Sequence, residues 1–559
     1  MSEGEVPANP RLLRSHGTPE SGYLRGEPGS DSPRADARAP ARAAGTLARD
    51  ALTPAHGAPT PAREAGAPRA DGGAERADGS AKRADGSAKR ADGGAKRAGG
   101  GAKKRADEGG ITPGVTPARR CAYAVLRRVF EEDAWADRAL HGEASRLGLD
   151  ARERALATQL AYGTVQRTAT LDALVEHLSA RPVARLEAPV LAALRLGAFQ
   201  LAFLDRVPAH AAVGESVELA KAHSPGGARL VNAVLRRAAR EAPRWLAGLG
   251  EGDPASAALR HSHPPWIAAL WWDALGPATT RALMAADNEP AENALRANAL
   301  RTTAEALGSA LPVRAHPAPG LPEGLVLDGP FDAWGSPQWE AGLLMPQSRP
   351  AMAVGRVLGP RPGERVLDLC AAPGGKTTHL AALMQGSGSV VAVERHPGRA
   401  DALRRTAARM GAGIVEVRTG DAAAPQEPVG YDRVLVDPPC SDLGTLASRP
   451  DARWRKHADQ LAELARVQAA ILRAGAGALR PGGTLVYSTC TISPQENERL
   501  VEAFLAERDD FEADDLQAGE RFGLHVWDHP RVDRFLQTLP HRDRTDGFFI
   551  ARLRRRGPA

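Results

Sequence analysis

The sequence contains few aromatic residues, few cysteines and no long apolar segment. Aromatic residues make up 4% of its 559 residues, whereas it has 58 glycines and 44 prolines. This balance indicates that part of the chain cannot bury enough apolar area to fold. No run of about 18 apolar residues occurs, which excludes a membrane-spanning helix. The opening stretch MSEGEVPANPRLLRSHG lacks the apolar core of a secretory signal.

The four cysteines are too few for a disulfide framework, and no two of them form a C-x-x-C pair. Disulfides persist in oxidising compartments, whereas thiols stay reduced in the cytoplasm. We therefore expect a cytoplasmic protein with reduced thiols.

The excess positive charge is concentrated near the N-terminus. Residues 51–110 contain twelve Lys and Arg against eight Asp and Glu, whereas residues 1–50 are balanced. Residues 74–101 repeat a seven-residue unit that has no large apolar position and a glycine in every copy, which excludes a coiled coil. We expect residues 1–112 to be a disordered, basic, low-complexity tail, either a tether that contacts phosphates or a solvated linker.

The spacing of apolar residues in residues 113–245 predicts an all-helical domain. Apolar residues recur at i, i+3 and i+4 in CAYAVLRRVF, ERALATQLAYGTVQRTATLDALVEHL, PVLAALRLGAFQLAFL and HAAVGESVELAKAH. Pro182, Pro208 and Pro225 separate these segments. A further short amphipathic helix contains Arg236 and Arg237, which either contact RNA or form an ordinary exposed face.

The rest of the chain divides into a small module and a larger α/β domain. Residues 246–340 combine a helix that starts at a proline (HPPWIAALWWDAL) with short strands in LRANALRTT, PVRAHP and GLVLDG, which predicts a small α+β module. Residues 341–556 alternate strands and helices. The expected strands are 365–369, 389–394, 413–418, 433–437, 484–488 and 547–553, with helices between the first five. This alternation predicts a parallel sheet whose ligand lies beyond the carboxyl ends of the strands.

Three of those strand ends carry the features of a nucleoside-binding crevice. The first strand leads into CAAPGGKT, whose small residues allow a ligand to approach the backbone before a helix begins. Glu394 ends the second strand, 19 residues after Gly375, where a carboxylate can bond ribose hydroxyls. Asp421 follows the third strand and can orient an adenine edge. A Walker A loop is disfavoured, because Cys370 stands where that motif needs glycine.

Two of the four cysteines follow neighbouring strands of the predicted sheet. Cys440 lies in VDPPCS after the fourth strand, and Cys490 lies in YSTCT after the fifth. Each is either a small buried hydrophobic residue or a polarizable nucleophile suited to conjugate addition to a pyrimidine. A metal site is disfavoured, since no histidine or third cysteine shares the spacing.

These motifs, taken in order, resemble a known family. VLDLCAAPGGKTTHL, VLVDPPCSDLGT and LVYSTCTISPQENE resemble the RsmB/Sun-type RNA cytosine-5 methyltransferases, and the resemblance covers about residues 116–555. It implies a multidomain fold: an all-α NusB-like RNA-binding domain, a small α+β linker module and a Rossmann-like class I methyltransferase domain. It also implies S-adenosyl-L-methionine as cofactor and small-subunit (16S) ribosomal RNA as substrate, with no metal and a monomeric enzyme.

The resemblance assigns roles to individual residues. The cofactor-binding residues it implies are Cys370, Ala371, Ala372, Pro373, Gly374, Gly375, Lys376, Glu394, Asp421 and Asp437. The catalytic residues it implies are Cys490, Cys440, Asp437 and Lys376. Cys490 is the nucleophile that adds to C6 of the cytosine, and Cys440 assists release. Asp442 departs from the family, in which a glycine usually follows PPCS.

Alternative functions remain open at this stage. The same chemistry on transfer RNA fits the methyltransferase motifs equally well. A DNA cytosine-5 methyltransferase would attack with the cysteine of its Pro-Cys motif, which here is Cys440. A non-catalytic NusB-like antitermination protein would need neither cysteine nor the cofactor loop. The sequence does not indicate which residue removes the C5 proton.

Overall fold

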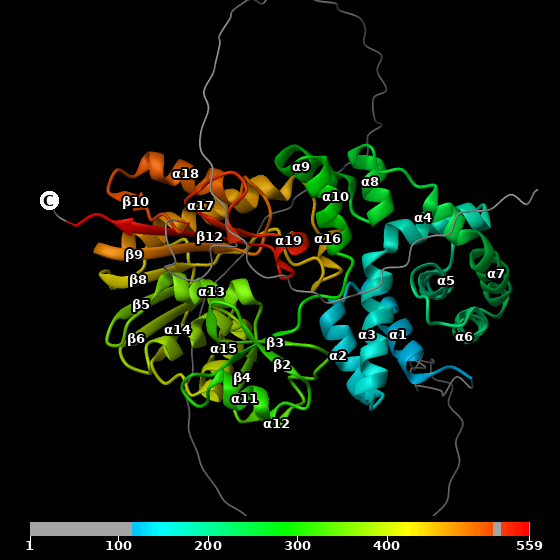
Figure 1. The fold of residues 1–559 in the computed structure, drawn as a ribbon, viewed down its shortest axis with the longest axis horizontal. Coiled ribbons are helices and arrows are strands. Elements are labelled where there is room, and N and C mark those ends of the chain that lie inside the picture. Colours follow the sequence, from blue (N-terminus) through cyan, green and yellow to red (C-terminus); the bar gives the residue numbers. More distant parts are fainter. Residues whose placement is uncertain (1–113, 518–526, 558–559) are drawn as a thin grey trace, which may run out of the picture. The chain divides into compact units, whose positions relative to one another are not determined.

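The structure is a computed structural model, and it describes residues 114–517 and 527–557 (Figure 1). The predicted tail, residues 1–112, lies outside the described residues. None of the helices in the described ranges combines the length and the hydropathy that a membrane span requires.

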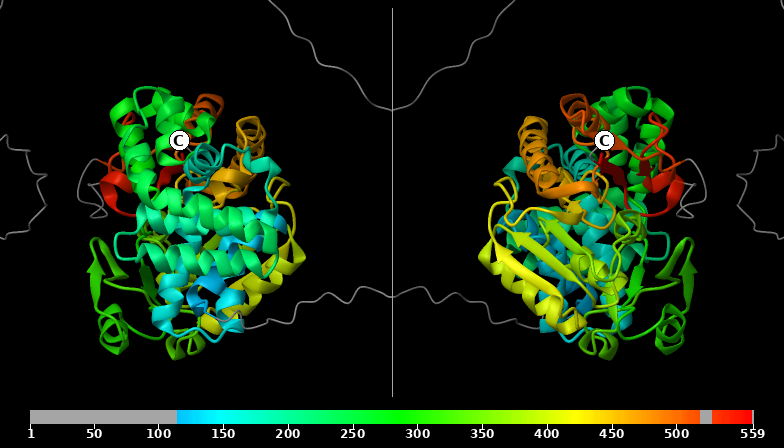
Figure 2. Two further views of the ribbon diagram at one scale, coloured as in Figure 1. Left: turned by 90° about the vertical axis from the view of Figure 1, so that its right-hand side faces the viewer. Right: turned by 90° about the vertical axis from the view of Figure 1, so that its left-hand side faces the viewer.

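The first part of the described chain is a bundle of α-helices, coloured blue to green in Figures 1 and 2. Its elements are α1 (Pro117–Glu131), α2 (Ala136–Arg146), α3 (Ala151–Gln166), α4 (Thr168–Ser179), the 3-10 turn η1 (Val183–Arg185), α5 (Ala188–Phe203), α6 (Ala209–Lys221) and α7 (Pro225–Ala247). Several begin at sequence signals: Asp150 caps α3 through the backbone N–H of Glu153, and Pro225 is the first residue of α7. One apolar core joins these helices.

The predicted all-helical domain is therefore confirmed, with three differences in detail. The sequence pattern missed α2, whose buried residues are mostly alanines, so its apolar stripe is weak. The long segment ERALATQLAYGTVQRTATLDALVEHL contains two helices, α3 and α4, with a break at Arg167. The segment around Arg236 is part of α7, a 23-residue helix and not a short one.

The middle of the chain forms a small helical and sheet module, as predicted. Three helices, α8 (Pro254–His261), α9 (Pro265–Leu275) and α10 (Pro277–Ala286), each begin at a proline. An antiparallel sheet follows, in the order β2-β3-β1-β4. Its strands are β1 (Ala294–Ala297), β2 (Ala315–Ala318), β3 (Leu321–Leu327) and β4 (Leu344–Pro346), accompanied by α11 (Ala304–Ala310) and α12 (Pro337–Glu340). Because β4 pairs with β1, this sheet uses residues beyond 340. The boundaries 113–245, 246–340 and 341–556 stay our proposal.

The large sheet has the strand order β10-β12-β9-β8-β5-β6-β7, with β11 paired to β12. Its strands are β5 (Arg365–Leu369), β6 (Ser389–Glu394), β7 (Val415–Thr419), β8 (Tyr431–Val436), β9 (Leu479–Thr489), β10 (Phe511–Ala513), β11 (Leu536–Thr538) and β12 (Phe548–Arg555). Strands β5 to β9 are parallel, as predicted. The C-terminal strand β12 runs antiparallel to β9, so the sheet is mixed.

Helices cover both faces of this sheet (Figure 1). On one face, α13 (Arg349–Leu358) and α14 (Gly375–Leu383) bury a core with alternate residues of β5, β6, β8, β9 and β12. On the other face, α17 (Gln460–Ala478) and α18 (Glu498–Glu507) bury the intervening residues of the same strands. The remaining helices are α15 (Pro397–Met410), α16 (Ala452–Arg455) and α19 (Pro540–Asp543).

One expected helix is absent. The prediction of a helix between each of the first five strands fails at residues 420–430, which connect β7 to β8 without one. Pro425 and Pro428 fall within these eleven residues, and neither can continue a short helix. The other three connections contain α14, α15 and the pair α16 and α17.

Candidate active site

The loop between β5 and α14 has the backbone that the glycine-rich sequence predicts. Cys370 and Gly374 adopt left-handed conformations, with φ of 67° and 104°. The N–H of Ala371 donates to the carbonyl of Val393 at 2.9 Å, which fixes the loop against the end of β6. A Cβ built on Gly375 would meet no atom within 4 Å, so open space adjoins the first turn of α14. The loop therefore presents backbone and space to a ligand.

Two carboxylates stand at the ends of the next strands. Glu394 is buried, and its carboxylate accepts from the backbone N–H of His396 at 2.9 Å and lies 3.5 Å from Arg399 Nε. Asp421 is exposed and accepts from the N–H of Ala423 at 3.0 Å. Both carboxylates are thus held at the sheet edge that bears the loop.

Lys376 and Asp437 form an ion pair beside this loop. Lys376 Nζ lies 2.7 Å from Asp437 Oδ2, and Ser488 donates its hydroxyl to Asp437 Oδ1 at 2.9 Å. Burial alone would favour the neutral amine, but the Asp437 carboxylate outweighs it and raises the pKa of Lys376. Both oxygens of Asp437 are therefore oriented, and Lys376 stays charged.

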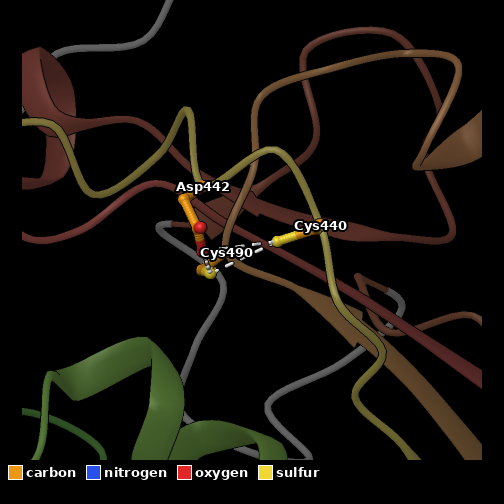
Figure 3. Close-up of side chains that lie close together, drawn as sticks. All are labelled: Cys440, Asp442 and Cys490. Carbon is orange, nitrogen blue, oxygen red and sulfur yellow. Dashed lines mark hydrogen bonds between the residues drawn. The ribbon is translucent and has the colours of Figure 1, made fainter. Parts of the chain in front are cut away.

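The two predicted cysteines meet at the ends of β8 and β9, together with Asp442 (Figure 3). The sulfurs of Cys440 and Cys490 are 3.4 Å apart. Cys490 Sγ lies 3.1 Å from Asp442 Oδ1, and Cys440 Sγ lies 3.8 Å from the same oxygen. The hydrogen bond with Cys440, burial and the nearby Asp442 carboxylate raise the pKa of Cys490 well above its usual value. At rest, Cys490 is therefore a thiol and not a thiolate.

Asp442 reaches the two sulfurs because the chain turns sharply after Cys440. Its φ of 60° is left-handed, a conformation that aspartate tolerates better than most residues. Lys456 Nζ lies 3.5 Å and Arg449 Nη1 lies 3.6 Å from its carboxylate oxygens. The two sulfurs and this carboxylate lie close enough together to be metal ligands. However, they offer fewer ligands than a structural zinc site, and two cations already neutralise the carboxylate.

A buried hydrogen-bond network holds in place the two segments that contain Cys440 and Cys490. Ser441 donates its N–H to Glu496 Oε1 at 2.9 Å, and Gln468 donates to the same oxygen at 2.9 Å. Gly444 donates to the carbonyl of Cys490 at 3.0 Å and accepts from Gly547 at 2.6 Å. The loop after β8, the end of β9 and the start of β12 are thereby tied together.

The structure brings the predicted site residues to one edge of the sheet, where the parallel strands β5, β6, β7, β8 and β9 end. Sequence reasoning missed the contact of Asp442 with both sulfurs, although it had singled out this residue as a departure from the family. It also missed Ser488, Arg449 and Lys456. A hydroxyl within the STC segment was a usable signal for Ser488, but no local pattern marks the two cations.

Comparisons with known proteins match three parts of the chain. The model of the 16S rRNA methyltransferase RsmB/F family matches residues 355–554. The NusB family matches residues 116–240, and the ferredoxin-like domain of RsmF/B-like methyltransferases matches residues 263–334. The helical bundle, the small module and the large sheet therefore each have a counterpart.

Individual relatives extend over most of the described chain. Probable ribosomal RNA small subunit methyltransferase B of Synechocystis sp. is 36% identical over 452 residues, which cover 78% of this chain and 99% of the relative. Its namesake in Bacillus subtilis is 34% identical over 455 residues, covering 79% and 99%. The crystal structure of PH0851 superposes with a TM-score of 0.67 at 25% identity, covering 78% of this chain and 99% of that chain.

The glycine-rich loop, the two carboxylates at successive strand ends and the matched domain define a methyltransferase that depends on S-adenosylmethionine. Its small module matches the ferredoxin-like domain of RsmF/B-like methyltransferases. The chain belongs to the RsmB/F family of 16S rRNA methyltransferases.

Proposed function

We propose that this enzyme methylates C5 of a cytosine in small-subunit ribosomal RNA through a covalent adduct between Cys490 and C6. The observation that carries the proposal is the pair of sulfurs, 3.4 Å apart, beside the Lys376–Asp437 ion pair. A soft nucleophile suits conjugate addition to a pyrimidine ring. The second thiol touches that nucleophile directly, so it can act on the same sulfur during release.

The residues at the strand ends fit S-adenosylmethionine. The open space beside Gly375 admits a ligand against the backbone of residues 370–376. Glu394 and Asp421 offer carboxylates for hydroxyl and amino groups of the nucleoside part, and Asp437 lies between this crevice and the cysteines. When bound, the cofactor supplies an electrophilic methyl group.

Each catalytic side chain has a defined task in this proposal. Cys490 attacks C6, and Asp437, held by Lys376 and Ser488, bonds the N3 and amino edge of the base. Lys376 keeps Asp437 oriented. The target base leaves its stack to reach the site, at a cost of a few kcal/mol. The helical domain and the small module bind the surrounding RNA.

Replacing each cysteine in turn tests the assignment. We expect Cys490→Ala to abolish methylation and any covalent RNA complex. Cys440→Ala should still attack, but the adduct should persist and migrate as a slow protein–RNA band in denaturing gels. The opposite pattern, with the trapped band only in the Cys490 variant, would assign attack to Cys440. Two merely structural thiols would give no adduct and a stability loss of about 1 kcal/mol or less.

The RNA target can be read directly. Bisulfite sequencing of ribosomal and transfer RNA from cells lacking the gene should show one 5-methylcytosine lost from small-subunit ribosomal RNA. If the 5-methylcytosine is lost from transfer RNA instead, the substrate is transfer RNA and the proposed cytosine-5 reaction is unchanged. We place the reaction in the cytoplasm and expect a monomer. A single species of 58.8 kDa in light scattering would support the monomer.

A further inference from the structure

The reaction proposed above needs a base that removes the C5 proton, and no residue has yet been assigned to this role. The carboxylate of Asp442 lies where such a base is needed. That reaction ends with removal of the C5 proton and expulsion of the cysteine. Within residues 114–517 and 527–557, Asp442 is the carboxylate in hydrogen-bond contact with Cys490 Sγ, at 3.1 Å. The adduct sulfur is bonded to C6, the neighbour of C5, so this oxygen lies within reach of the C5 substituents.

Other acidic groups near the site are engaged elsewhere. Asp437 holds Lys376 and Ser488. Glu496 lies beneath the loop and accepts from Ser441 and Gln468. Asp442, in contrast, faces both sulfurs and keeps a fifth of its side chain exposed. Arg449 and Lys456 flank its carboxylate at salt-bridge distance, which holds this side chain in place beside the two sulfurs.

Asp442 also lies on the face of the pyrimidine ring from which the C5 proton must be removed. Once sulfur is bonded to C6, it shields one face of the pyrimidine, and the methyl group enters C5 from the opposite face. The C5 hydrogen is then turned to the face that carries Cys490. Asp442 lies beside that sulfur, so its carboxylate is on the side to which the hydrogen points.

We infer that Asp442 is the catalytic base that removes the C5 proton from the methylated adduct. The inference rests on the proposed cytosine-5 chemistry. The C5–H electron pair forms the C5=C6 double bond, the C6–S bond breaks, and its pair leaves on Cys490 sulfur. The proton passes to Asp442 and from it to the thiolate, which restores the thiol–carboxylate contact of the resting enzyme. The proton that the net reaction releases is the one that Cys490 loses before it attacks.

Asp442→Asn tests this role with little change in shape. Asparagine tolerates the left-handed backbone at this position, so the loop should keep its fold. We expect turnover on a small-subunit ribosomal RNA transcript to fall about 100-fold or more. A covalent complex carrying the transferred methyl group should accumulate. Deuterium at C5 of the cytosines should slow the variant more than it slows the wild type, because proton removal has become rate-limiting.

A second variant allows rescue. Glycine also accepts the positive φ, and Asp442→Gly leaves space for a small carboxylate. Added formate should restore turnover in Asp442→Gly and not in Cys490→Ala. The matched control is Asp401→Asn, which removes an exposed carboxylate paired with Arg404 on α15 and should change none of these readouts.

The outcomes separate this inference from the proposed function. RNA containing 5-fluorocytidine has no C5 proton to lose, so wild type and Asp442→Asn should both be trapped on it. Failure of the wild type to be trapped would overturn the covalent mechanism itself. Trapping of the wild type alone would show that Asp442 is needed for attack and overturn its role as the C5 base. The assignment of Asp442 as the C5 base would also be overturned if Asp442→Asn kept the turnover of the wild type. The same holds if the isotope effect increased in Cys440→Ala but not in Asp442→Asn.

Discussion

At the scale of single residues, a buried carboxyl group beneath the cofactor loop gives the fold a pH dependence. Asp368 lies in β5, and its carboxylate accepts from the hydroxyl of Thr377 at 2.7 Å. Burial raises the pKa of Asp368 from 3.8 to about 7, although the Thr377 hydrogen bond opposes this. Between about pH 4 and pH 7 the native state therefore binds a proton that the unfolded chain has released.

Replacing this group should flatten the pH dependence of stability. For wild type, the contribution of Asp368 to the free energy of unfolding is largest below about pH 4. It falls as the pH rises to about 7, with a limit on the order of 4 kcal/mol. Asp368→Asn removes the titration, so its stability relative to wild type should rise over that window. Denaturant unfolding of both proteins at pH 4.5 and pH 7.5 measures the difference, and parallel pH profiles would contradict the prediction.

The open space at Gly375 gives a second prediction at this scale. Gly375→Arg places a long side chain where the cofactor is proposed to lie, and the Cβ that it adds meets no atom within 4 Å in the free protein. We expect a nearly unchanged melting temperature and loss of S-adenosylhomocysteine binding in calorimetry, where wild type shows one site per chain. If Gly375→Arg still bound S-adenosylhomocysteine, this loop would not be part of the cofactor site.

The sequence located most of the site, because its residues follow strands that are themselves easy to recognise. Cys440 and Cys490 were expected to converge, since parallel strands end at the same edge of a sheet. The contact of Asp442 could not be predicted in this way. It depends on the left-handed turn that reverses the chain after Cys440, and a single non-glycine residue with positive φ leaves no periodic signal.

At the scale of elements, the strands show what the pattern can and cannot predict. Strands β5, β6 and β8 each contain a run of buried, mostly apolar residues, so their positions were predicted within a few residues. The antiparallel insertion of β12 between β9 and β10 was not predicted, because an apolar run carries no information about its neighbours. The helix expected between β7 and β8 fails for a local reason, its two prolines.

A glycine contact between two elements is critical for the active site. A Cβ on Gly444 would come within 1.9 Å of the carbonyl oxygen of Gly547, which precedes β12. Gly444→Ala should therefore push the loop after β8 away from β12, lower turnover at least tenfold and destabilise the enzyme by roughly 1–3 kcal/mol. Gly214→Ala is the matched control: this exposed helix position has open space, and alanine should stabilise it by about 0.5–1 kcal/mol. Steady-state kinetics and thermal melting compare the two, and equal behaviour would refute the steric argument.

At the scale of the whole described unit, one buried arginine joins the three parts of the chain. Arg453, in α16, donates to the carbonyls of Gln166, Ser262, Asp287 and Leu446 and to the side chain of Asn288. These acceptors come from the helical bundle, the small module and the large α/β domain. The adjacent Trp454 donates to the carbonyl of Val165 at 2.8 Å. The segment between Asp442 and α17 is thus anchored on the other two parts.

Removing this arginine should uncouple the parts. Arg453→Met keeps apolar bulk but leaves four buried carbonyls without this donor, so we expect a loss of roughly 3 kcal/mol or more and faster proteolysis between α7 and α8. Arg473→Met provides the control, because its ion pair with Glu507 is half exposed and contributes about 1 kcal/mol or less. Thermal melting and limited proteolysis report both effects. Similar losses in the two variants would show that Arg453 is not the link.

The inner position of β12 also governs the order in which the protein can form during synthesis. Helices α1 to α7 are contiguous in sequence and can pack as soon as they leave the ribosome. One edge of strand β9 stays unpaired until residues 548–555 leave the ribosome and form β12 beside it. An unpaired edge recruits other chains. Premature termination shortly before residue 548 would therefore yield a folded helical bundle attached to an aggregation-prone sheet.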